Sequence, residues 1–204
     1  MKHCEAALPK GYTEVFHIDA KNKKVGLIFN AIAFIPLVIM GIIFAFTAKD
    51  FSFVTNARES TEASLIFFAR LAGLMFGIFA YIILHELTHG VAYKALTKEK
   101  LTFGISWSCA FCGVPNVYVY RKTAIIALMA PFVTFTLILL PLTIIFAFID
   151  TYFYLLFGFL FAMHFGGCCG DLYMFFLLTF KYKDNTLLMR DTGPEQWIYL
   201  QNNH

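Results

Sequence analysis

Four long apolar segments constrain this chain more than any other feature of its sequence. They cover residues 25–48, 71–93, 123–149 and 151–180, and a helix needs about 20 apolar residues to cross a bilayer. Because 59% of the 204 residues are hydrophobic and 14% are charged, a soluble domain of this size could not bury so much apolar surface. We therefore expect an all-α membrane protein, with about four transmembrane helices bundled in a single domain over 1–204.

The basic residues predict how these helices are oriented. Five lysines lie in the polar arm 1–24, and further lysines and arginines lie in the loop 94–122 and in the tail 181–204. Since Lys and Arg favour the cytoplasmic side, we expect a cell-membrane protein with both termini in the cytoplasm. The first apolar run follows a polar arm and is long enough to span, so we expect it to remain as an anchor. A net charge of +3 does not indicate a nucleic-acid partner.

The second apolar run contains the sequence His85-Glu86-Leu87-Thr88-His89. Residues four apart lie on one face of a helix, so the two imidazoles can bind one ion, and Glu86 can act as general base on an attacking water. The alternative is a polar patch near the end of a membrane helix, but such residues are costly in an apolar span and tend to be functional. This pattern on a helix is typical of zinc peptidases, so we expect Zn²⁺ as the cofactor.

A catalytic zinc ion usually has three protein ligands, and Asp171 is the candidate for the third. It is the only carboxylate in the fourth apolar run, and the small residues Gly166 and Gly170 beside it would let two helices approach closely. Counted from the nearest basic flank, its depth is roughly 15 Å, against roughly 14 Å for His85 and 8 Å for His89. We therefore predict one metal site that lies toward the cytoplasmic side of the membrane.

Two motifs carry a family resemblance: His85, Glu86, His89 and Gly90, and the stretch 164–171, His-Phe-Gly-Gly-Cys-Cys-Gly-Asp. Through them the chain resembles a family of prokaryotic zincin-type membrane peptidases and is more distantly similar to site-2 proteases. The resemblance implies a peptidase that cleaves within or beside the bilayer, with Asp171 as a metal ligand. These families often carry an Asn about two turns before that Asp, where this chain has His164. His164 could contact substrate or hydrogen-bond to a metal ligand, and a bond to a helix carbonyl is an equal alternative.

The loop from Leu101 to Tyr120 predicts one or two short strands with a turn, a hairpin between the second and third helices. Its segment from Val114 to Tyr120 could be an edge strand that pairs with an unwound substrate, and Asn116 could contact that substrate. The alternative is a loop that only covers the bundle. Cys109 and Cys112 form one CxxC pair, which could be a second metal site or a dithiol; we favour small apolar residues in a strand.

Together these features predict a membrane-embedded zinc metallopeptidase of the site-2-protease type. Its partners would be the lipid bilayer and membrane protein or peptide substrates. One alternative is a membrane protein that binds or transports metal ions, because His and acidic residues in spans also build ion pathways. The other is a catalytically silent relative that binds membrane proteins.

Overall fold

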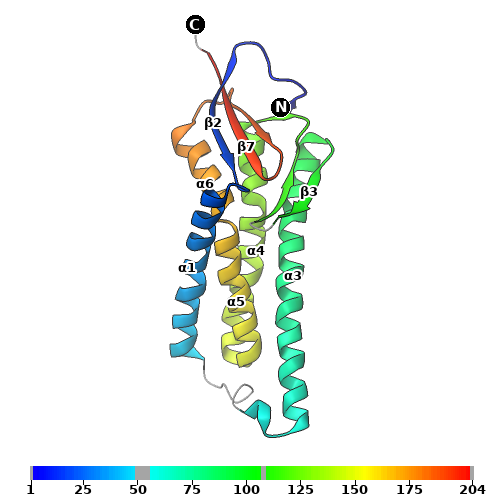
Figure 1. Ribbon diagram of the computed structural model, residues 1–204, viewed down its shortest axis with the longest axis vertical. Coiled ribbons are helices and arrows are strands. Elements are labelled where there is room, and N and C mark those ends of the chain that lie inside the picture. Colours follow the sequence, from blue (N-terminus) through cyan, green and yellow to red (C-terminus); the bar gives the residue numbers. More distant parts are fainter. Residues whose placement is uncertain (1, 49–55, 107–108, 203–204) are drawn as a thin grey trace. The chain divides into compact units, whose positions relative to one another are not determined.

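The computed structural model describes residues 2–48, 56–106 and 109–202 and is mostly helical (Figure 1). The helices are α1 (Lys23–Thr47), η1 (Asn56–Arg58), α3 (Thr61–Thr97), α4 (Arg121–Ile149), α5 (Thr151–Gly167), α6 (Cys169–Phe176) and the π-helical turn η2 (Leu177–Lys181). Among the described residues, α1, α3 and α4 are long and apolar enough to cross a membrane. The segments Thr151–Gly167 and Cys169–Lys181, bent by 42°, would form a fourth span if they act together. The expected helical runs are therefore confirmed, with a break in the fourth.

The apolar side chains of these helices are widely exposed. Phe46 on α1, Phe76 on α3 and Phe148 on α4 are 86%, 75% and 81% exposed. Side chains of this kind would be unfavourable in water but match the interior of a bilayer. The chain therefore has the surface of a membrane protein as well as helices of the required length.

The expectation of an all-α protein is wrong for the two ends of the chain. The strands β1 (Cys4–Glu5), β2 (Tyr12–Asp19), β5 (Tyr118–Tyr120), β6 (Leu188–Asp191) and β7 (Glu195–Gln201) form an antiparallel sheet in the order β1-β5-β6-β7-β2. Four of these strands come from the segments expected as a polar arm and a polar tail. A sheet with one covered face needs an apolar residue only at alternate positions, so a strand can be polar on average.

One apolar residue from each strand lies in a row across this sheet. The row, defined by the strand register, is Cys4, Val119, Met189, Ile198 and Phe16. Its members pack with Tyr93 of α3, Ala127 of α4 and Met174 of α6 in one hydrophobic core. The two polar ends of the chain therefore pack against the helices through this row of apolar side chains.

The expected hairpin between the second and third helices is confirmed. Its strands are β3 (Thr102–Ile105) and β4 (Ala110–Gly113), which pair in antiparallel register. The expectation of an edge strand from Val114 to Tyr120 is wrong, because β5 pairs with β1 on one side and with β6 on the other. A strand with two neighbours has no free backbone edge for a substrate. Among the described strands, β4 has β3 as its partner and keeps its second edge.

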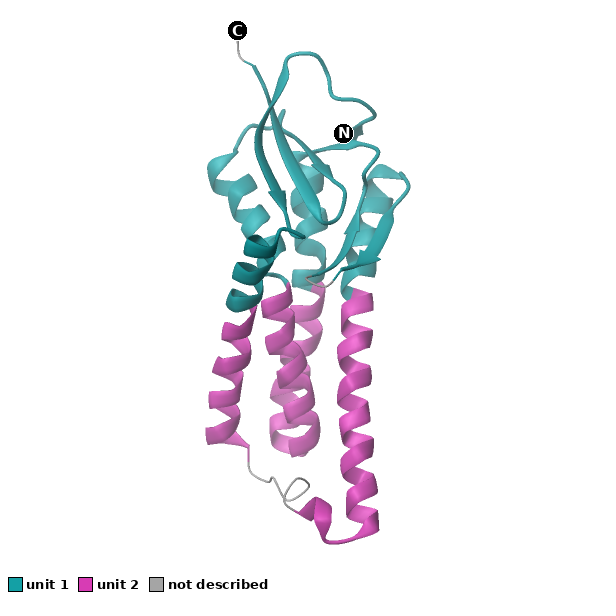
Figure 2. Ribbon diagram, in the orientation of Figure 1, with its two compact units in different colours: residues 1–32, 85–133, 168–204 teal, residues 33–84, 134–167 magenta. Residues whose placement is uncertain are grey.

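The chain divides into two compact units, each built from segments distant in sequence (Figure 2). Unit 1 comprises residues 1–32, 85–133 and 168–204 and contains both sheets and the core described above. Unit 2 comprises 33–84 and 134–167 and is helical, with a core of Tyr81, Phe135, Leu139 and Leu160. The candidate metal ligands all belong to unit 1. The expectation of a single domain stays a prediction.

Candidate metal centre

The helix α3 presents both histidines of the sequence motif on one face. His85 and His89 are each 6% exposed, and their ring centroids lie 5.0 Å apart. The helix continues for two further turns to Thr97, where it ends because Lys98 adopts a left-handed backbone with φ of 60°. Since the motif lies well inside this continuous helix, the spacing of four residues brings both imidazoles to the same place.

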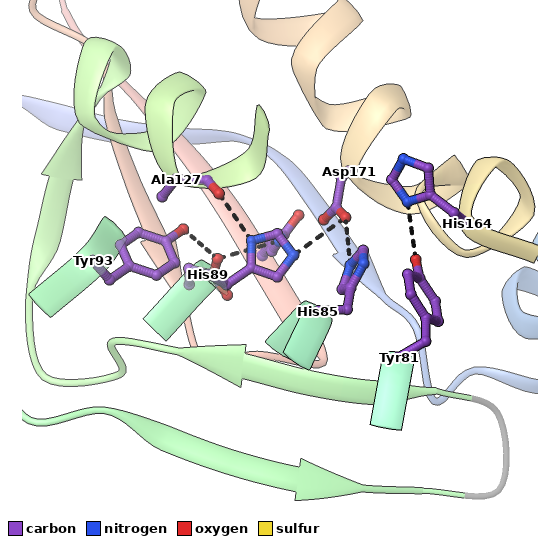
Figure 3. A network of polar contacts seen from close by, with 9 residues as sticks. Tyr81, His85, His89, Tyr93, Ala127, His164 and Asp171 are labelled. Atoms are coloured by element: carbon purple, nitrogen blue, oxygen red, sulfur yellow. Dashed lines mark hydrogen bonds and ion pairs between the residues drawn. The ribbon is translucent and has the colours of Figure 1, made fainter. Parts of the chain in front are cut away.

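Asp171 lies opposite these histidines, in the first turn of α6. Its Oδ2 is 3.4 Å from His85 Nε2 and 3.3 Å from His89 Nε2 (Figure 3). Ligands about 2.05 Å from a tetrahedral ion lie about 3.3 Å from each other, so these separations fit a zinc ion. All three ligand atoms lie within 4.8 Å of one another. The structure thus brings together the three side chains that the sequence indicated as metal ligands, and a set of two imidazoles and one carboxylate suits zinc.

A backbone group that the sequence analysis did not identify fixes the orientation of His89. The Nδ1 of His89 lies 2.9 Å from the carbonyl oxygen of Ala127 on α4 (Figure 3). Because a carbonyl can only accept, Nδ1 is the donor in this bond, and Nε2 is left to face Asp171. Side-chain chemistry could not have indicated Ala127, since it acts through its main chain.

The carboxylate of Asp191 ties this part of α3 to the sheet. Its Oδ2 accepts a hydrogen bond of 2.6 Å from the hydroxyl of Tyr93, one turn beyond His89, and its Oδ1 accepts one of 2.8 Å from Gly193 N. The backbone oxygen of Asp191 also accepts from Val114 N, at 2.8 Å. Asp191 is 2% exposed, and burial raises its pKa to about 6. The sequence alone does not indicate Asp191, because this residue lies in the segment expected as a tail.

Glu86 lies between the histidines and the hairpin. Its side chain is half-buried, and the backbone amide of Cys112 in β4 interacts favourably with its carboxylate. The end of β4 lies against the turn between β6 and β7. Val114, the residue after β4, donates its N–H to the backbone oxygen of Asp191, and a side chain at Gly113 would collide with the backbone of Gly193. The sheet formed by the chain ends therefore positions the hairpin that contacts Glu86.

The two cysteines of the hairpin are free thiols. Cys112 is 6% exposed, and burial raises its pKa to about 12, so its thiolate is disfavoured near neutral pH. Within residues 2–48, 56–106 and 109–202, neither Cys109 nor Cys112 belongs to a group of three metal-binding side chains. This agrees with the interpretation of both residues as small apolar members of the strand region.

Two further candidate residues, His164 and Asn116, were expected to contact substrate or a metal ligand. His164 is fully buried in unit 2, where its Nδ1 lies 3.1 Å from the Tyr81 hydroxyl and its Nε2 lies 3.1 Å from the Thr136 hydroxyl. Both of these contacts are with hydroxyl groups. Asn116 lies in the exposed turn before β5. A role for either residue in binding substrate stays a prediction.

Comparisons with known proteins identify a family. Neither the comparison with curated proteins nor that with solved structures found a match. A family model described as "Putative zincin peptidase" matches residues 78–186, which is more than half of the chain and includes the histidine motif and Asp171. The chain therefore belongs to this zincin peptidase family, whose description implies a zinc metallopeptidase.

Proposed function

We propose that this protein is a membrane-embedded zinc metallopeptidase that hydrolyses peptide bonds of membrane-associated proteins. The observation that carries the proposal is the convergence of His85 Nε2, His89 Nε2 and Asp171 Oδ2 within 4.8 Å. Membership of the zincin peptidase family supports the reaction, and the exposed apolar helices support a substrate that reaches the site from the bilayer. We name Zn²⁺ as the cofactor because two imidazoles and a carboxylate form a common catalytic zinc set with one position open.

Each side chain of the site has a separate role in this proposal. His85, His89 and Asp171 would hold the metal. A zinc ion bound there supplies Lewis acidity, which lowers the pKa of water and polarises the scissile carbonyl. Glu86 takes the proton from the attacking water and then delivers it to the leaving amine. The Cys112 amide interacts favourably with the charged form of the Glu86 carboxylate.

We place the site toward the cytoplasmic side of the membrane, with both chain ends in the cytoplasm. Lys94 follows the histidines on α3, and Lys181 ends the segment that begins with α6. Basic residues at these two helix ends favour the same side. The proposed topology also keeps the five-stranded sheet in an aqueous phase, where its polar face would be solvated.

We infer that β4 presents the substrate in extended form. A peptide bond within a helix is shielded by its own hydrogen bonds, so a substrate must unwind before cleavage, and an edge strand can pair with it. Ser106 N donates to Cys109 O, so these two residues form a hydrogen-bonded pair. Because hydrogen-bonded and non-hydrogen-bonded pairs alternate along an antiparallel hairpin, the amides of Ala110 and Cys112 point away from β3. The second of these amides already contacts Glu86, which supports the free edge of β4 as the place where a substrate strand lies beside the base.

Proline substitution tests this role for β4. Ala110→Pro removes an amide from the free edge without removing a bond to β3, so cleavage should fall while zinc remains bound. The matched control is Ile105→Pro, on the outer edge of the same hairpin and directly opposite Ala110, which should leave cleavage unchanged. Equal cleavage by both variants would contradict substrate pairing at β4.

The catalytic proposal is tested by a single isosteric change. Glu86→Gln keeps the size of the side chain but cannot accept the proton, so cleavage of tagged single-span membrane proteins should be lost while zinc content is retained. Glu62→Gln, in the first turn of the same helix, is the matched control and should behave as the parent. Parental cleavage by Glu86→Gln would overturn the proposal. Uptake of zinc ions into vesicles that contain the protein would favour a transporter.

A further inference from the structure

We infer that Pro131 is a positioning residue for the metal ligand His89, a conclusion that rests on the proposed zinc site. Pro131 lies inside α4, four residues after Ala127. In an α-helix the amide of each residue bonds to the carbonyl four residues earlier, and proline has no amide hydrogen. The carbonyl left without its helical partner by Pro131 is therefore that of Ala127, which accepts the bond from His89.

The surroundings of this carbonyl make its partner important. Ala127 is 0% exposed and Pro131 is buried, so water does not readily replace the missing helical bond. An unpaired backbone carbonyl at such a place costs free energy, and the Nδ1–H of His89 satisfies it at 2.9 Å. The ring of a proline also crowds the carbonyl four residues before it and tilts that carbonyl away from the helix axis. Both effects aim the Ala127 oxygen toward a donor outside α4.

The consequence for the metal site follows from the chemistry of imidazole. With Nδ1 committed as a donor to Ala127, Nε2 is the ring nitrogen that can bind a metal, and it is the atom that lies 3.3 Å from Asp171 Oδ2. If residue 131 carried an amide hydrogen, that amide would compete for the same carbonyl. The bond that holds the His89 ring in the binding orientation would then be weakened, even though a carbonyl can accept two hydrogen bonds.

The second proline of α4 provides a matched control. Pro141 removes the same type of bond from Leu137, but Pro141 is exposed and Leu137 is 70% exposed. The bond lost at Pro141 lies on the outer face of the helix, so no metal ligand depends on it. The two prolines therefore share their effect on the helix and differ in whether a histidine uses the freed carbonyl.

The experiment compares the parent with Pro131→Ala, Pro131→Val and Pro141→Ala. Pro131→Val keeps a branched side chain in the buried position, so it separates the restored amide from a loss of volume. Zinc affinity should fall about ten- to a hundredfold in both Pro131 variants, the range typical for losing a partner of a metal-binding histidine, and should be unchanged in Pro141→Ala. Parental zinc affinity in both Pro131 variants would overturn the inference.

A spectroscopic measurement decides the inference separately from the proposed function. In protein labelled with ¹⁵N-histidine, the Nδ1–H proton of His89 should resonate downfield in the parent and in Pro141→Ala, and should move upfield in both Pro131 variants. This signal reports the hydrogen bond whether or not zinc is present. An unchanged resonance in the Pro131 variants overturns the role of Pro131, whereas a parent that takes up no zinc contradicts the proposed metal site.

Discussion

Both compact units contain buried histidines, but the imidazoles contact different groups. In unit 1, His89 donates to a backbone carbonyl through Nδ1, and its Nε2 lies 3.3 Å from the Asp171 carboxylate. In unit 2, the two ring nitrogens of His164 each lie 3.1 Å from a hydroxyl group. A hydroxyl can donate to one ring nitrogen or accept from the other, so two of them satisfy a neutral imidazole. A carbonyl on one nitrogen and a carboxylate near the other form an arrangement that a cation completes.

This difference teaches that burial alone does not identify a metal-binding histidine in an apolar span. His85 and His89 are each 6% exposed and His164 is 0% exposed, so exposure does not separate them. Their partners do, because Asp171 brings a negative charge that requires a positive one nearby. The comparison therefore predicts that substitutions in unit 1 change metal binding, whereas substitution of His164 changes stability.

The largest effect should follow removal of a ligand in unit 1. Binding of a structural zinc ion is worth about 10–16 kcal/mol, so each of three ligands contributes about 3–5 kcal/mol. His85→Ala, His89→Ala and Asp171→Ala should each weaken zinc binding by about two to four orders of magnitude, as measured by competition with a chelator. Asp184→Ala, at an exposed carboxylate, is the control. A ligand variant that keeps parental affinity would remove that residue from the site.

A smaller effect should follow from the buried Asp191. Its pKa of about 6 in the folded protein exceeds the ordinary value of 3.8, so the folded state holds the proton more tightly than the unfolded state. The contribution of Asp191 to the free energy of unfolding is therefore fully present below about pH 4. It is lost as the pH rises through about 6, and the loss amounts to about 3 kcal/mol. In Asp191→Asn this decline should disappear, as measured by thermal unfolding of metal-free protein in detergent. The same decline in Asp191→Asn would show that another group causes it.

The smallest effect on the metal is expected from unit 2. His164→Phe removes the partner of two hydroxyl groups, so it should lower the free energy of unfolding by about 1–3 kcal/mol. We expect its zinc affinity to equal that of the parent, because both ring nitrogens of His164 already lie 3.1 Å from a hydroxyl group, that of Tyr81 or that of Thr136. A loss of zinc in this variant would break the comparison and place His164 with the metal ligands.

The sequence predicted the helices and the ligands because their signals are strong and local. Apolar runs long enough to span a membrane stand out in any chain, and His85, His89 and Asp171 are conspicuous within them. The sheet was missed because each of its strands contributes one apolar residue to the row that includes Met189 and Ile198. The pairing of these residues becomes apparent only when the partner strands are known.

The supporting groups of the site could not be predicted for a similar reason. Ala127 holds His89 through a carbonyl that any residue would provide, and only Pro131, four positions later, marks that carbonyl as available. Asp191 is distant in sequence from Tyr93, and their contact requires the sheet to be in place. Local chemistry thus indicates the groups that bind a metal, whereas the groups that orient them depend on tertiary contacts.

The central claim is that two imidazoles and one carboxylate bind the zinc ion. X-ray absorption spectroscopy of the zinc-loaded protein tests this claim most directly, because it reports the atoms bound to the metal. We predict nitrogen and oxygen ligands at about 2.0–2.2 Å, with the scattering pattern of two imidazole rings that is reduced to one ring in His89→Ala. Sulfur at about 2.3 Å, or an all-oxygen shell without imidazole, would contradict the account.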